Sequence, residues 1–134
     1  MKGYWKILLI LMLAVGFASC EDDQGEIEYV ITGRAWTGDV GMNAHNGEPL
    51  FSTFEFGNDG FGVETQFYAS DGLLYDQFRF QWYWEDRYSN NLVLDYGRNG
   101  TSYMDNVDIY RGVMTGIFYL TGDSEGFPFT LEMQ

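Results

Sequence analysis

The feature that most constrains the fold of this 134-residue chain is a short-range alternation of apolar and polar residues that recurs from position 27 onward. Each alternating run is bounded by Gly, Asn, Asp or Ser, and no helical stripe of useful length appears. A period of two places successive side chains on opposite faces of a β-strand. The sequence therefore predicts an all-β fold with strands near 27–37, 50–57, 61–69, 75–85, 91–97, 104–110, 113–121 and 127–133.

The alternation is clearest in the run 75–85. Its aromatic face carries Phe78, Phe80, Trp82 and Trp84, and its other face is mainly polar. The preceding strand, 61–69, alternates between an apolar set that begins at Phe61 and a second set that includes Glu64 and Gln66. Residues 57–60 (GNDG) predict a hairpin, because a primed turn needs the positive φ that these residues tolerate.

Eight strands in chain order with short turns suit a single eight-stranded antiparallel up-and-down barrel, since closure removes exposed strand edges. A β-sandwich is the alternative. In the last strand, Pro128 lacks a backbone donor, which predicts an edge position or a bulge there. Eight is also the strand number at which a barrel interior either fills with side chains or admits one small ligand.

The inward aromatic residues fit both of those interiors. They are most simply a packed core, because large aromatics dominate core burial. They could also form the wall of a ligand cavity. In that second case the predicted ligand-binding residues are Trp36, Phe80, Trp82, Trp84 and Tyr96.

The N-terminal segment has the organisation of an export signal. Lys2 and Lys6 precede a run of 12 uncharged residues, 7–18. This run is shorter than the roughly 20 residues that span a membrane. Residues 17–20 (FASC) resemble a bacterial lipobox, in which small residues precede a cysteine that is diacylated and becomes the new N-terminus. The resemblance implies a lipoprotein signal peptide at 1–19 and lipid attachment at Cys20. The alternative is ordinary cleavage near Ala18, with Cys20 an exported thiol.

An acidic segment separates this cysteine from the alternating region. Residues 21–26 (EDDQGE) predict a solvated tether, so that 20–26 joins the anchor to a barrel domain at 27–134. The segment also resembles the acidic tract that follows the lipidated cysteine in surface-exported lipoproteins of the Bacteroidetes. That resemblance implies an outer-membrane protein that faces the cell exterior. The two acyl chains of a diacylated cysteine suffice for stable anchoring.

A second resemblance concerns the domain itself. Residues 33–36 (GRAW), 54–60 (FEFGNDG), 80–82 (FQW) and 92–96 (LVLDY) look like parts of the small lipocalin-like lipoprotein domains of Bacteroidetes. The resemblance implies a lipocalin-like barrel. This chain differs from the lipocalin opening in having two residues between Gly33 and Trp36.

The charge of the chain narrows the classes of partner. Removal of residues 1–19 removes both lysines and leaves 5 Arg against 20 acidic residues, a net charge of −15. A field this negative repels phosphate backbones and anionic head groups, which argues against nucleic acid and against an electrostatic membrane partner. Cationic partners are compatible with it.

The sequence offers little catalytic chemistry. His45 is the only histidine and lies in a Gly- and Asn-rich loop, and Cys20 is the only cysteine. Without a cluster of His or Cys, the sequence predicts no metal site, no cofactor and no enzyme. A small hydrolase would need a pair of carboxylates, for which Glu55 with Glu64, or Glu85 with Asp86, are candidates that resemble ordinary exposed acids.

The sequence therefore predicts a non-catalytic binding module for a small hydrophobic ligand or a glycan, displayed as an outer-membrane lipoprotein. The alternative is a lipoprotein with a filled barrel that has a structural or protein-interaction role. Tyr75, Tyr83 and Tyr88 are candidates for stacking on sugars or on a protein partner.

Overall fold

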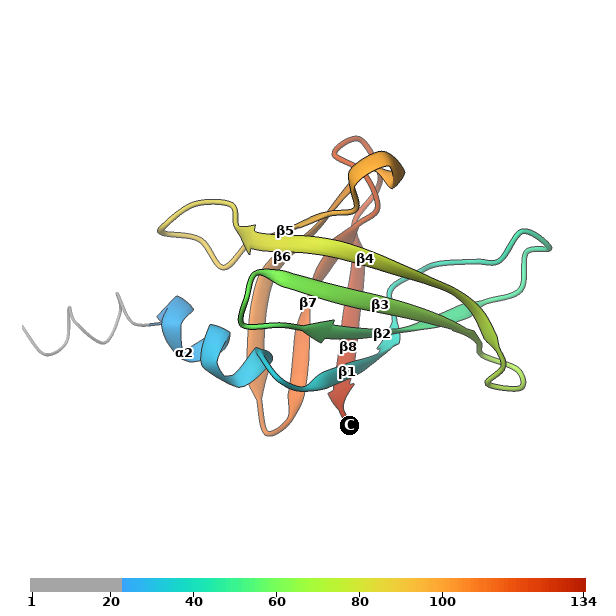
Figure 1. Ribbon diagram of the computed structural model, residues 1–134, viewed down its shortest axis with the longest axis horizontal. Coiled ribbons are helices and arrows are strands. Elements are labelled where there is room, and N and C mark those ends of the chain that lie inside the picture. Colours follow the sequence, from blue (N-terminus) through green and yellow to red (C-terminus); the bar gives the residue numbers. More distant parts are fainter. Residues whose placement is uncertain (1–22) are drawn as a thin grey trace, which may run out of the picture.

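Eight antiparallel strands pair in chain order and close into a barrel through β1 and β8 in the computed structural model, which describes residues 23–134 (Figure 1). The strands are β1 (Ala35–Asp39), β2 (Leu50–Phe56), β3 (Phe61–Tyr68), β4 (Leu74–Trp84), β5 (Leu92–Asp95), β6 (Thr101–Tyr110), β7 (Val113–Tyr119) and β8 (Phe127–Met133). The predicted lipocalin-like up-and-down barrel is confirmed, and the β-sandwich alternative is wrong. The predicted signal peptide at 1–19 and Cys20 lie outside the described residues.

The helix α2 (Asp23–Ile31) precedes the barrel and lies against one of its ends (Figure 1). The prediction of a strand over 27–37 is therefore wrong in its first half, and residues 23–26 of the predicted tether form the first turn of this helix. Ile27 and Ile31 are both buried in the barrel core, and Val30 packs against it. Apolar residues at i, i+3 and i+4 share one face of a helix, so α2 can bury this short stripe.

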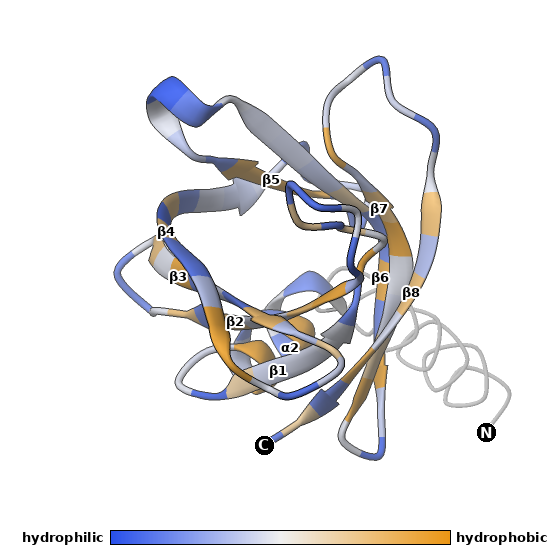
Figure 2. Ribbon diagram, turned by 90° about the vertical axis from the view of Figure 1, so that its right-hand side faces the viewer, coloured by the Kyte–Doolittle hydropathy of each residue, from blue (hydrophilic) through white to orange (hydrophobic). Residues whose placement is uncertain are grey.

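The alternating strand directions divide the connections between two ends of the barrel. We call the end against which α2 lies the closed end; it also carries the turns at 57–60 and 111–112 and the loop 85–91. We call the opposite end the open end; it carries the connections 40–49, 69–73 and 120–126, together with the 3₁₀ turn η1 (Gly97–Asn99). Figure 2 looks into the molecule from the side opposite α2 and shows the ring of strands with the helix behind it.

Aromatic side chains fill the closed half of the barrel. The ring of Phe56 meets those of Phe80 and Trp82 edge-on, with centroids 5.6 and 5.4 Å apart, and Phe54 meets Phe80 at 6.4 Å. Trp36 is fully buried, and its indole N–H donates to the carbonyl of Ile31 in α2. Edge-to-face pairs of this kind stabilise a core beyond the burial of their area.

The inward face of β3 is polar, in contrast to its neighbours. Glu64 and Gln66 are each only 4 % exposed, whereas Phe61 on the opposite face is 57 % exposed. The pairing of Phe54 with Glu64 and of Ser52 with Gln66 keeps these residues on the inner face of the β2–β3 hairpin. The interpretation of Glu64 as an ordinary exposed acid is therefore wrong, because register with β2 fixes the face that each β3 residue presents.

Closure of the barrel depends on a close approach between β1 and β8. A Cβ atom at Gly38 would lie 2.3 Å from the carbonyl oxygen of Thr130, so the seam requires glycine there. Closure also means that β8 is not an edge strand, contrary to one prediction from Pro128. Pro128 pairs with Ile117 of β7, and it lies beyond the last β1–β8 pair, Asp39 with Thr130. The missing proline donor is tolerated at this corner.

Candidate ligand-binding site

A cavity of about 330 Å³ opens at the open end of the barrel. Its wall is formed by residues of the β1–β2 connection, of β3 and β4, of the β5–β6 connection, of β6 and β7, and of the β7–β8 connection. These are Met42, Asn43, Glu64, Gln66, Tyr75, Asp76, Phe78, Tyr96, Asn99, Ser102, Phe118 and Leu120. Small-molecule sites in proteins occupy about 300–1,000 Å³, so this space is large enough for a small ligand.

The carboxyl group of Glu64 is the centre of a buried polar cluster in this cavity. Its Oε2 accepts hydrogen bonds from Ser52 Oγ at 2.8 Å and from Gln66 Nε2 at 3.1 Å. Its Oε1 accepts one from the hydroxyl of Tyr96 at 2.6 Å. An ionised carboxyl group acts only as an acceptor, which matches three donors converging on one side chain.

Tyr96 joins this cluster to the aromatic core. It directly follows β5, and its ring lies 5.4 Å from that of Phe80 and 6.3 Å, at right angles, from that of Phe78. Burial, and then the charge of Glu64 and their hydrogen bond, raise the pKa of the Tyr96 hydroxyl well above its ordinary value. Tyr96 therefore keeps its proton at neutral pH and remains a donor to Glu64.

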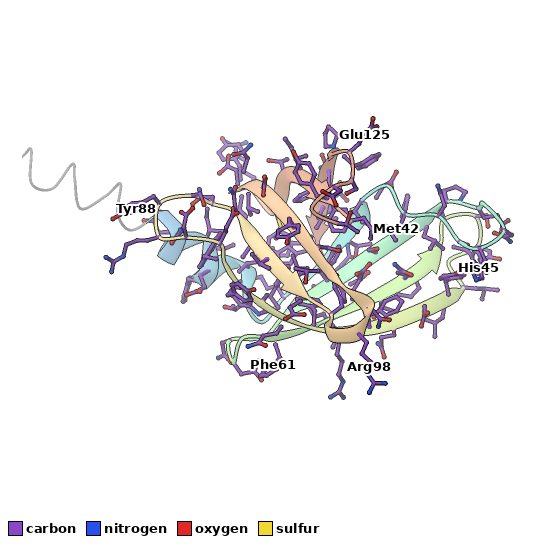
Figure 3. The ribbon with its side chains drawn as sticks, turned by 90° about the horizontal axis from the view of Figure 1, so that it is seen from above. Met42, His45, Phe61, Tyr88, Arg98 and Glu125 are labelled. Carbon is purple, nitrogen blue, oxygen red and sulfur yellow. The ribbon has the colours of Figure 1, made fainter. Side chains whose placement is uncertain are left out.

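The remaining wall combines apolar surface with a polar mouth. Phe78, Phe118 and Leu120 supply the apolar part, and Met42 from the β1–β2 connection packs against the core. Figure 3 shows Met42 close to the barrel and His45 farther along the same connection, away from it. The backbone N–H of His45 donates to the hydroxyl of Tyr75, 3.1 Å away, so this long connection is fastened to the start of β4.

Of the five ligand-binding residues predicted from the sequence, Tyr96 lines this cavity and the other four do not. Trp36 donates its indole N–H to the carbonyl of Ile31 at 3.1 Å and so joins α2 to the barrel. Trp82 donates to the carbonyl of Gly57 at 3.0 Å, and Trp84 donates to Glu28 Oε1 at 3.3 Å. These three tryptophans and Phe80 pack in or beside the closed half.

Sequence reasoning missed Gln66 and Ser52 as members of a site, and it considered Glu64 only as a partner of Glu55 in a hydrolytic pair. The signal was the polar set on β3, which is regular enough to mark one face of a strand. Alternation by itself does not say which face turns inward. Only the pairing with β2, whose inward residues include Phe54, identifies the polar set as internal.

Comparison with known proteins adds no relative. No family model, no curated protein and no solved structure matches the chain. The interpretation of the site therefore depends on its own geometry and chemistry, because a barrel of this kind hosts many functions.

The carboxylate pairs considered for hydrolysis are not assembled as a site in this cavity. Glu55 and Glu64 lie on opposite faces of the barrel wall, since Glu55 is exposed and Glu64 is internal. Partial burial and, to a lesser extent, the charge of Glu85 raise the pKa of Asp105, but neither of these two residues lines the open-end cavity. Within residues 23–134, no group of three or more His, Cys, Asp or Glu side chains is placed to hold a metal ion.

An aromatic groove of about 470 Å³ lies on the outside of the closed end, between α2 and the end of β4. Tyr29 and Tyr83 are exposed there beside the half-buried Trp84, and Glu28, Thr32 and Asn58 supply polar groups.

The described part of the chain has no helix with the length and hydropathy needed to cross a membrane.

Proposed function

We propose that this chain is a non-catalytic binding lipoprotein of the outer membrane, anchored through Cys20 and facing the cell exterior, whose barrel holds a small ligand at its open end. The observation that supports this proposal is the cavity of about 330 Å³ in the barrel. It combines apolar surface with a few convergent polar groups, which is the usual composition of a small-molecule site.

The anchor and the cavity suit one orientation of the molecule. Cys20 precedes the start of α2 at Asp23 by three residues, and three residues span at most about 11 Å. An acylated Cys20 would therefore hold the closed end near the membrane. The open end would face away from it, where a ligand can enter.

Native mass spectrometry of the full chain recovered from its own cells tests the binding function. The expected result is a retained small molecule on the wild type and its loss from Leu120→Trp, because the larger side chain would fill the cavity mouth. Leu74→Trp is the matched control, since Leu74 is exposed at the start of β4 and does not line the cavity. A bare mass for the wild type, or equal retention by Leu120→Trp, would argue against a ligand in this cavity.

The anchor is tested separately by fractionation of cells that carry Cys20→Ala. The variant should leave the outer-membrane fraction, and protease treatment of intact wild-type cells should remove the domain. Retention of Cys20→Ala in the membrane fraction would overturn lipidation, and a domain spared by protease would overturn surface display.

The aromatic groove at the closed end supports a second candidate function, the binding of a glycan. Exposed rings flanked by polar groups suit a ligand with apolar faces and a polar rim. Titration with cellohexaose should then give saturable binding that Tyr83→Ala abolishes and that Tyr110→Ala, at an exposed tyrosine on β6, leaves unchanged. Equal binding by both variants would argue against this site.

A further inference from the structure

We infer that the open-end cavity selects a cationic ligand, an ammonium group on a compact apolar body, with the ammonium paired to the carboxylate of Glu64. This inference rests on the proposed binding function and names the class of its ligand. Three independent features of the cavity support it: the charge of its lining, the unused acceptor capacity of Glu64, and the placement of the apolar surface.

The lining of the cavity carries two acidic side chains, the buried Glu64 and the exposed Asp76, and no Lys, Arg or His. Arg98, in the adjacent η1 turn, is exposed, and Figure 3 shows its side chain pointing away from the barrel. The whole chain is acidic as well. Low-dielectric walls lined by one sign of charge concentrate ligands of the opposite sign.

The hydrogen bonds of Glu64 leave its charge without a cationic partner among the described residues that contact it. Its three donors are a hydroxyl, an amide and a phenol, all of them neutral. A buried carboxylate is costly unless it is both hydrogen-bonded and paired with a charge. An ammonium group in the cavity would supply the missing charge.

The geometry also leaves a position for one more donor. A carboxylate has about four acceptor positions, and three are taken on Glu64. Oε2 accepts two hydrogen bonds, whereas Oε1 accepts only the one from Tyr96. The free position is therefore on Oε1, and an N–H of an ammonium group is a donor that gains from the negative charge.

Apolar side chains determine the rest of the ligand. Phe78, Phe118 and Leu120 line the same cavity as Glu64, so the body attached to the ammonium would contact them. An anionic ligand would meet Glu64 and Asp76 with like charge. A neutral ligand could fill the space but would leave the charge of Glu64 unpaired.

Calorimetric titration of the full chain at neutral pH with three probes that share one body tests the inference. The probes are 2-phenylethylammonium, 2-phenylethanol and phenylacetate. We expect the ammonium to bind at least tenfold more tightly than the alcohol, and the phenylacetate to bind most weakly. Glu64→Gln should weaken the ammonium at least tenfold and leave the alcohol within about threefold. The matched control, Glu55→Gln, removes an exposed acid from the neighbouring strand and should change neither.

The outcomes separate this inference from the proposed function. If the alcohol or phenylacetate binds as tightly as the ammonium, and Leu120→Trp blocks that binding, the cavity holds ligands but the cationic preference is overturned. An unchanged ammonium affinity in a folded Glu64→Gln overturns the role of Glu64. If no probe binds the wild type, both the inference and a small-ligand function for this cavity fail. Should Glu64→Gln not fold, the order of the three probes on the wild type still decides.

Discussion

The two halves of the barrel share one sheet and have opposite interiors. In the closed half, Trp36, Phe56 and Trp82 belong to one buried apolar cluster that also contains Ile27 and Ile31 of α2. In the open half, Glu64 and Gln66 on the inward face of β3 line a cavity, and the buried Ser52 of β2 donates a hydrogen bond to Glu64. A large apolar side chain buried at each of these positions would stabilise the fold by about 1.5–3 kcal/mol, and the polar residues do not provide this stabilisation. The difference indicates that the closed half contributes more to stability, and it agrees with the binding role proposed above for the open half.

The largest expected effect comes from the closed half. Trp36→Ala should lower the free energy of unfolding by about 3–5 kcal/mol, because it leaves a cavity under α2 and removes the hydrogen bond to Ile31. Denaturant unfolding measures the change. Tyr83→Ala, on the exposed face of β4, is the control and should change stability by less than about 0.5 kcal/mol. A similar loss in both variants would remove the distinction between the packed interior and the outer surface.

A smaller effect is expected from the polar cluster of the open half. Tyr96→Phe keeps the ring contacts but removes the hydrogen bond to Glu64, and should cost about 1.5–3 kcal/mol, the range for a hydrogen bond to a charged group. The same unfolding measurement applies. An effect as large as that of Trp36→Ala would mean that the open half contributes to stability as much as the closed half does.

The pH dependence of that effect follows from the raised pKa of Tyr96. An unfolded tyrosine ionises near pH 10, whereas folded Tyr96 ionises at higher pH, so the unfolded state loses its proton first. The contribution of Tyr96 is therefore complete below about pH 10 and is lost as the pH rises through the pKa of the folded state. We expect the stability difference between wild type and Tyr96→Phe to be constant from pH 7 to about 9 and to shrink above about 10. A difference that grows in alkali would contradict this assignment.

The smallest expected change in stability is at the cavity mouth. Leu120→Ala should alter the free energy of unfolding by less than about 0.5 kcal/mol, because Leu120 is half exposed. It should nevertheless weaken a bound ligand, since it removes apolar wall surface. Thermal unfolding with and without 2-phenylethylammonium separates the two effects. A large loss of intrinsic stability would show that the mouth is part of the packed core.

The fold was largely predictable because the strands of the barrel follow from the local alternation of apolar and polar residues, and its hairpins follow from local turn residues. Seven of the predicted strands occur close to their expected positions, and the predicted turn at 57–60 joins two of them. The first half of the first predicted strand was wrong because the segment 27–31 is short and rich in β-branched residues. At that length, a helical stripe with Ile27 and Ile31 is hard to distinguish from a strand.

The site was less predictable because it depends on register and on depth within the barrel. The sequence identified the aromatic faces but could not show that Trp36, Trp82 and Trp84 lie in the closed half, nor that Tyr96 alone of the five predicted ligand-binding residues lines the cavity. The inward orientation of Glu64 follows from its pairing opposite Phe54, which is a contact between strands. Composition was informative in a coarser way, since residues 20–134 are acidic and contain no lysine, which agrees with a cavity that lacks basic residues.

The contrast between the two halves is tested most directly by an NMR titration of the full chain with 2-phenylethylammonium. The side-chain amide of Gln66 and the ring of Tyr96 report on the open half, and the indole N–H groups of Trp36 and Trp82 report on the closed half. The account predicts saturable shifts of the Gln66 and Tyr96 signals while the two indole signals stay in place. Shifts centred on the indoles, or no shifts at millimolar probe, would contradict it.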